Sequence, residues 1–145
     1  MKRMNKLFAA FTLFFLITPS QALELPGPLV ESGWLADNFG QVVILDVRKD
    51  IDSFTSQARM RKDKKTGQLS IVSVGGHIEG ARLVNYKKVR ATRSVDGKDL
   101  TRMLPAQADF ESLMQQLGLS NDSTVLIVSK GMSGADLTMA ARLYW

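Results

Sequence analysis

Two uninterrupted runs of apolar and mostly β-branched residues constrain the fold of this chain more than any other feature. Residues 42–45 read VVIL, and residues 124–128 read TVLIV. A run without alternating polar positions is typical of a strand that is covered on both faces, as in a parallel sheet. Between the two runs, apolar residues recur at helical spacing in residues 105–118, which predicts an amphipathic helix. The order strand, helix, strand predicts a parallel α/β unit.

This helix has recognisable end signals, and the remaining segments predict smaller elements. Pro105 suits a helix start and Gly118 suits a helix stop. Asp96 and Gly97 predict a turn. The apolar face of the helix is expected to consist of Phe110, Leu113, Met114 and Leu117. The other expected elements are an extended piece at residues 29–30, one or two helical turns N-capped by Ser32, a hairpin whose return strand is residues 68–74, and a short strand at residues 81–84.

The last stretch of the chain, residues 125–145, predicts a buried strand, a glycine-bearing loop and a helix that begins near Gly134 or Ala135. The residues of this helix that we expect to pack in the core are Leu137, Ala140, Ala141 and Tyr144. Residue 145 falls inside the predicted helix with no cap or glycine after it, which leaves the last carbonyl groups unsatisfied. We therefore expect that the domain is cut short here.

The N-terminus has the three-part pattern of a secretory signal peptide. A basic start is followed by an uncharged, mostly apolar run of 11 residues at positions 7–17, and then by small residues at Ser20 and Ala22. This run is shorter than the roughly 20 residues that a membrane-spanning helix needs, so no stable membrane anchor is expected. The sequence predicts a signal peptide at residues 1–22, cleavage after Ala22, export to the periplasm and a working domain at residues 23–145.

Composition excludes several classes of function. The chain has no cysteine, which rules out a disulfide framework and any thiolate nucleophile or thiolate metal ligand. Its single histidine, His77, cannot build a zinc site alone, so neither a metal nor another cofactor is predicted. Because residues 1–22 hold three basic and no acidic residues, cleavage lowers the net charge from +5 to +2. The basic run at residues 59–65 lacks aromatic residues and indicates a solvated hairpin tip rather than a nucleic-acid site.

Several segments together resemble a known family. They are WLADN followed by VVILDVR, then GGHIEGARLVNY, then FESLMQQLGLSNDSTVLIVSKG, and finally MAARLYW. In this order, over residues 29–145, they resemble a rhodanese-like domain, and more closely the N-terminal domain of the exported tandem sulfurtransferases of bacteria. The most specific parts are Leu-Asp-Val-Arg at residues 45–48 and Gly-His-Ile-Glu-Gly-Ala at residues 76–81.

The resemblance implies a five-stranded parallel sheet with helices on both faces, and a thiosulfate sulfurtransferase in the full protein. In tandem members of the family the active cysteine lies in the second domain, which would be an intramolecular partner of this one. The first domain keeps the corresponding loop without the cysteine, and here Ser129 is closest to the cysteine position. The matching loop is Ser129, Lys130, Gly131, Met132, Ser133 and Gly134.

The chemistry of this loop follows from its expected place at the carboxyl edge of the sheet, where open α/β folds bind ligands. Its backbone N–H groups, the start of the helix and Lys130 suit a small anion such as thiosulfate or sulfate. Ser129 cannot act as the sulfur carrier, because a hydroxyl is far less acidic than a thiol and does not form a persulfide. Asp46 and Arg48 are expected to form an internal pair that supports the loop region, and His77 a backbone hydrogen bond in a turn.

The sequence leaves two other functions open. One is a free-standing inactive rhodanese module that binds an anion or a partner protein. The other is a serine hydrolase in which Ser129 or Ser133 is the nucleophile, His77 the base and Asp46 its orienting carboxylate. The sequence GMSGA does not match the Gly-x-Ser-x-Gly elbow, since Ala135 stands where the second glycine is required.

Overall fold

The computed structural model of the chain describes residues 23–144, so the predicted signal peptide and Trp145 lie outside the described residues. Within that range no helix is both long enough and apolar enough to cross a membrane. The α-helices are α1 (Ser32–Asp37), α2 (Gln107–Gln116) and α3 (Gly134–Tyr144), and the 3-10 helices are η1 (Phe39–Gln41), η2 (Ile51–Phe54) and η3 (Tyr86–Val89). The strands are β1 (Val43–Arg48), β2 (Arg59–Lys62), β3 (Leu69–Ser73), β4 (Arg82–Asn85), β5 (Ala91–Val95), β6 (Lys98–Met103) and β7 (Val125–Val128).

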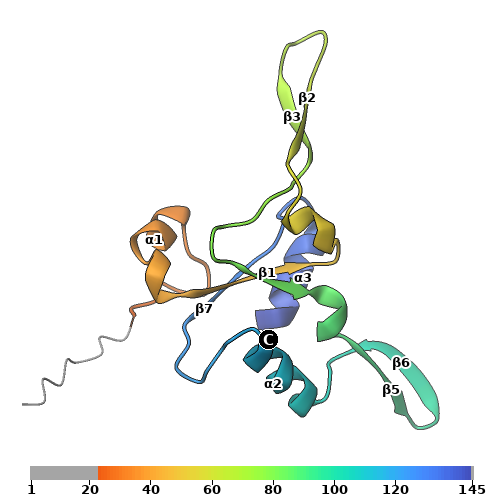
Figure 1. Cartoon of the computed structure of the whole chain (residues 1–145). Coiled ribbons are helices and arrows are strands. Elements are labelled where there is room, and N and C mark those ends of the chain that lie inside the picture. The colour runs from red at the N-terminus through yellow and green to blue at the C-terminus, as the bar shows by residue number, and fades with distance from the viewer. Residues whose placement is uncertain (1–22, 145) are drawn as a thin grey trace, which may run out of the picture.

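The two apolar runs form neighbouring parallel strands, as predicted. β1 lies in the middle of a three-stranded sheet with the order β4-β1-β7, and both of its pairings are parallel (Figure 1). Its position explains its composition, because all but the first of its residues are buried. The described part of the chain is thus a mixed α/β fold with a parallel sheet. This sheet has three strands, fewer than the five that the resemblance implies.

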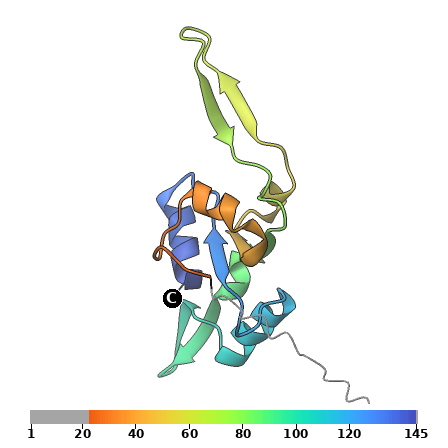
Figure 2. The ribbon, with the colours of Figure 1, turned by 90° about the vertical axis from the view of Figure 1, so that its left-hand side faces the viewer.

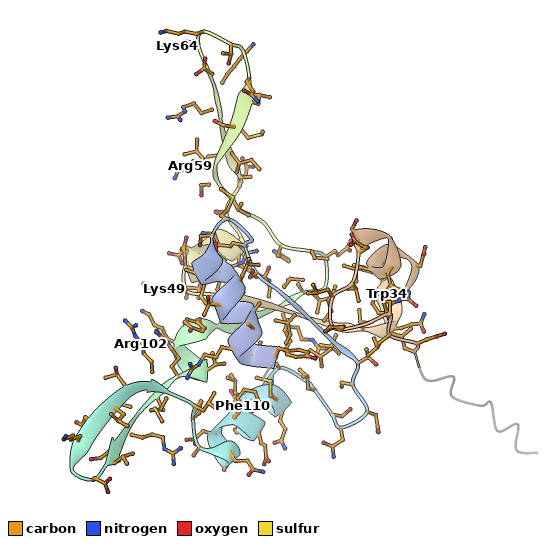
Figure 3. The ribbon with its side chains drawn as sticks, turned by 180° about the vertical axis from the view of Figure 1, so that it is seen from behind. Trp34, Lys49, Arg59, Lys64, Arg102 and Phe110 are labelled. Carbon is orange, nitrogen blue, oxygen red and sulfur yellow. The ribbon has the colours of Figure 1, made fainter. Side chains whose placement is uncertain are left out.

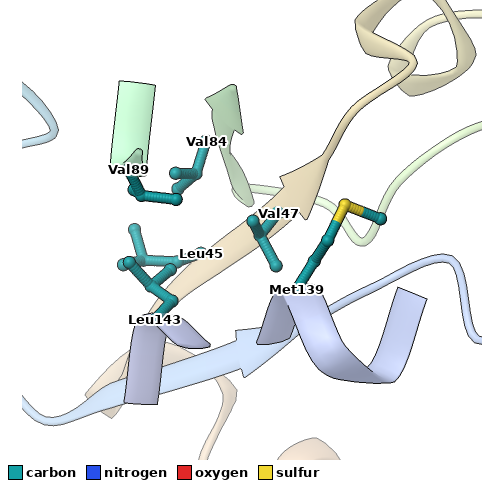
Figure 4. Packing of buried hydrophobic residues seen from close by; sticks show 6 residues of the cluster. All are labelled: Leu45, Val47, Val84, Val89, Met139 and Leu143. Atoms are coloured by element: carbon teal, nitrogen blue, oxygen red, sulfur yellow. The ribbon is translucent and has the colours of Figure 1, made fainter. Parts of the chain in front are cut away.

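The hydrophobic core lies on one face of β1. Leu45 and Val47 of this strand point toward α3, where they meet Met139 and Leu143 (Figure 4). The apolar face of α2 packs against the same cluster and is half-buried, as the helical spacing predicted. The other buried members of the cluster are Val84 of β4, which is an edge strand of the sheet, and Val89 of η3.

The ends of α2 differ in how well the sequence predicted them. The helix begins at Gln107 rather than at Pro105, because Ala106 has the extended conformation of an N-cap, with φ −61° and ψ 149°. The predicted stop is confirmed: Gly118 has φ +73°, in the left-handed region that favours glycine. Arg82 of β4 donates a hydrogen bond to the carbonyl of Leu117, which joins this helix end to the sheet.

The predicted core face of α3 is largely wrong. Leu137 is 62% exposed and Tyr144 is 61% exposed, whereas Met139 and Leu143 are the buried apolar residues of this helix. The helix is apolar on more than one side, so its periodicity alone did not identify the side that faces the core. The position of α3 relative to β1 determines which side of the helix is buried.

Two hairpins extend from the body of the molecule in different directions (Figures 1 and 2). The β2–β3 hairpin confirms the predicted basic tip, and its side chains Arg59 and Lys64 are exposed (Figure 3). At this tip, the backbone N–H groups of Thr66 and Lys65 donate to the Asp63 carboxylate and lower its pKa below the usual value. The β5–β6 hairpin contains the turn predicted at Asp96 and Gly97.

Gly75 lies where the chain returns from the β2–β3 hairpin, and we expect Gly75→Ala to lower the free energy of unfolding by about 1–3 kcal/mol. A Cβ atom at this position would lie 2.6 Å from backbone atoms of Ser56 and Gln57, so the two segments would have to separate. Gly40→Ala is the control, because its Cβ would meet no atom within 4 Å. Urea unfolding measures both changes, and equal midpoints for the two variants would contradict the predicted close approach.

Candidate functional site

The loop that follows β7 is organised mainly as the start of α3. The backbone N–H of Asp136 donates to the carbonyl and to the hydroxyl of Ser133, at 3.0 and 3.3 Å. The Ser133 hydroxyl in turn donates to the Asp136 carboxylate, at 3.0 Å. Gly131 has φ +71°, a conformation that glycine adopts without strain. Ser133 therefore caps the start of α3, and its hydroxyl is bonded to Asp136 rather than to a histidine.

The positive features of this loop already face carboxylates of the chain. Lys130 Nζ lies 3.5 Å from an Asp50 carboxylate oxygen. The buried Asp136 carboxylate lies in the first turn of α3, near the positive end of the helix dipole. Lys130 and the start of α3 therefore each have a carboxylate of the chain beside them. The six residues of the candidate anion loop are consecutive in the sequence, and their one charged side chain, Lys130, is paired with Asp50.

Asp46 and Arg48 form the internal pair that the sequence predicted. Arg48 donates from Nε and Nη2 to the two carboxylate oxygens of Asp46, each at 2.6 Å. It also donates to the Ser53 hydroxyl at 3.2 Å and to the Gly76 carbonyl at 2.7 Å. Its guanidinium carbon lies 5.5 Å from the centre of the Phe54 ring. Arg48 thus joins the end of β1 to η2 and to the segment that precedes β4.

His77 belongs to the same supporting structure. Its Nδ1–H donates to the carbonyl of Phe54 at 2.8 Å, and the two rings are stacked with their centres 3.9 Å apart. This confirms the predicted backbone hydrogen bond. Within residues 23–144 no hydrogen bond links His77 to Ser129 or Ser133, and Asp46 is already paired with Arg48. The arrangement required for a serine hydrolase is not formed.

A groove of about 940 Å³ opens beside Ser129. β7 forms one wall, and because it pairs only with β1 among the described strands, it is an edge of the sheet. Leu137 and Ala141 of α3 line the groove next to it, and Trp34, Leu25 and residues 27–30 line the other parts (Figure 3 labels Trp34). Most of the lining side chains are apolar, and none is charged.

Several residues that support this region were not predicted from the sequence. Ser53 and Phe54 of η2 contact Arg48 and His77, and the carbonyl of Gly76 accepts from Arg48. The useful signal was the polar Ser53 shortly after the predicted Asp-Arg pair. The groove was not predicted from the sequence either, because its walls come from three separate segments. In the described part of the chain, no group of three His, Cys, Asp or Glu residues is placed to hold a metal ion.

Comparisons of the chain with family models, with curated proteins and with solved structures found no match.

Proposed function

We propose that this chain forms a non-catalytic rhodanese-like domain of an exported, periplasmic sulfurtransferase of the thiosulfate type. Its role is structural: it packs against a second rhodanese-like domain that carries the cysteine persulfide. The observation that carries the proposal is the sequence of elements at the sheet edge, where parallel strand β7 leads through a glycine-bearing loop into α3. The position that would carry a thiol in this reaction holds Ser129.

The supporting pair Asp46–Arg48 agrees with this proposal. The two motifs that make the resemblance specific, at residues 45–48 and 76–81, lie far apart in the sequence. In the structure they are joined by the hydrogen bond from Arg48 to the Gly76 carbonyl. The two motifs therefore have a common structural role, which is to join the end of β1 to the segment that precedes β4.

The apolar groove supports the structural role. Leu29 is 89% exposed and Leu137 is 62% exposed, and both line the groove beside the edge strand β7. Exposed apolar side chains next to unpaired strand groups favour association with further protein. A second domain that covers this groove would bury these side chains and shield the end of the Ser129 loop.

We expect the chain itself to produce no thiocyanate from thiosulfate and cyanide, because it has no thiol to accept the sulfur. We expect Ser129→Cys to form a persulfide with thiosulfate, since the new thiol lies at the end of β7 before the start of α3. In this step the cysteine thiolate bonds to the outer sulfur of thiosulfate, the sulfur–sulfur bond of thiosulfate breaks, and sulfite leaves with that bond's electron pair. Mass spectrometry measures the added sulfur atom. Ser112→Cys, on the exposed surface of α2, is the matched control and should remain a free thiol.

Two results would contradict the proposal in different ways. Thiocyanate production by the unaltered chain, above a heat-denatured control, would show that a thiol is not required. Equal reactivity of the two cysteine variants would show that the Ser129 loop is not a sulfur-binding loop. The coding sequence gives a further test: a stop codon directly after residue 145 would exclude a covalently linked second domain and would favour the free-standing module.

A further inference from the structure

Three cationic side chains line a cavity of about 260 Å³ at the base of the β5–β6 hairpin. Lys87 comes from η3, Arg90 follows it, and Arg102 comes from β6 (Figure 3 labels Arg102). Thr92 and Thr101 add hydroxyl groups to the same wall. Within residues 23–144 the ion pairs are Arg48–Asp46 and Lys130–Asp50, so no described carboxylate lies within ion-pair distance of these three cations.

Arg90 is held in place but has unused hydrogen-bonding capacity. Its guanidinium carbon lies 4.5 Å from the centre of the Tyr86 ring, a cation–π contact that orients the plane of the group. Its Nε is buried and has no hydrogen-bond partner among the described residues. A buried donor of this kind is costly unless a partner completes it. The Nη groups of Arg90 also donate no hydrogen bond to residues 23–144, and because Arg90 lines the cavity these groups can donate to a ligand bound there.

The backbone around the cavity departs from regular strand geometry on both β5 and β6. The register of the β5–β6 pair shifts between Ala91 and Arg93, and Thr92 lies in this bulge. Arg102 has φ +62°, which is strained for a residue with a side chain. Bulges and strained residues of this kind often redirect side chains at functional sites.

Arg142 of α3 fixes the base of the hairpin to the body of the molecule. Its guanidinium donates to the carbonyl of Val89 at 3.4 Å and also to the carbonyl of Arg102. These two carbonyls come from the two arms that enclose the cavity. The segments that carry the three cations are therefore attached to α3 by hydrogen bonds.

We propose that this cavity binds a tetrahedral oxyanion, such as sulfate, phosphate or thiosulfate. Planar guanidinium groups and a lysine supply the charge, and threonine hydroxyls supply further donors for the oxygens. At about 30 Å³ per water, the cavity has room for one such ion together with several waters. The site is distinct from the Ser129 loop, and the inference does not depend on the proposed sulfurtransferase role.

The test is a titration of the isotope-labelled full chain with sodium sulfate or phosphate, followed by NMR. We expect saturable shifts of the Arg90 Nε–H signal and of the Thr92 and Thr101 amides, and no saturation with chloride at matched ionic strength. Arg90→Met should weaken binding roughly tenfold or more, because a hydrogen bond to a charged group contributes about 1.5–3 kcal/mol and each 1.4 kcal/mol is a factor of ten. Lys87→Gln should weaken it by a smaller factor.

Lys98→Gln is the matched control, since it removes one positive charge from the far end of the same hairpin. Lys98 lies four positions from Arg102 along β6, a distance of about 13 Å, which exceeds the Debye length at physiological salt. We therefore expect less than about a twofold effect. Thermal unfolding checks that Arg90→Met is folded, and Lys87→Gln alters only an exposed side chain. Shifts that do not saturate, or equal weakening by all three variants, would indicate general screening and overturn the proposal.

Discussion

Replacing Arg48 with methionine is expected to lower the free energy of unfolding by about 3–5 kcal/mol, because the substitution leaves the buried Asp46 carboxylate without its partner. Arg48 is 3% exposed and Asp46 is 2% exposed, so water cannot replace the lost hydrogen bonds. The substitution also removes the donors to Ser53 and to the Gly76 carbonyl. The segments after β1 and before β4 would then lose their common attachment.

Urea unfolding of three variants separates this explanation from a general effect of losing a positive charge. Lys130→Met removes the partly exposed pair with Asp50 and should cost no more than about 1 kcal/mol. The double variant Asp46→Leu, Arg48→Met should be more stable than Arg48→Met alone, because no charge remains buried without a partner. A double variant no more stable than the single one would contradict the role of the unpaired carboxylate.

The elements that the sequence predicted best are those with a strong local pattern. The run before Asp46 and the run before Ser129 were identified as parallel strands because uninterrupted β-branched residues suit a strand covered on both faces. The helix between them was identified by its apolar spacing, and its end by Gly118, whose φ is positive in the structure. The pair Asp46–Arg48 was also predictable, since a buried acid and base two residues apart on a strand lie on the same face.

The features that the sequence did not predict arise from contacts between distant segments. The cavity beside Arg90 forms where η3 meets the irregular pairing of β5 and β6, and Arg142 reaches it from a helix 53 positions beyond Val89. The buried side of α3 depends on where β1 lies. Neither the bulge at Thr92 nor the positive φ of Arg102 has a local sequence signal, because neither position is a glycine.

The two apolar sides of α3 are expected to respond very differently to truncation. Leu143→Ala should lower the free energy of unfolding by about 2–5 kcal/mol, because Leu143 is 8% exposed and belongs to the core cluster with Leu45 and Val47. Leu137→Ala should change it by less than about 0.5 kcal/mol, because Leu137 is 62% exposed and lines the groove. Both substitutions replace one good helix former with another, so helix propensity contributes little.

Chemical denaturation of the two variants under the same conditions measures this difference and also bears on the function of the groove. If Leu137 belongs to a surface that associates with a second domain, its truncation should leave the stability of this domain unchanged and weaken only the association. A loss of stability at Leu137 comparable to that at Leu143 would show instead that the groove closes on itself in solution. In that case the edge of β7 would not be open to a partner, and the groove would no longer support the structural role proposed for the domain.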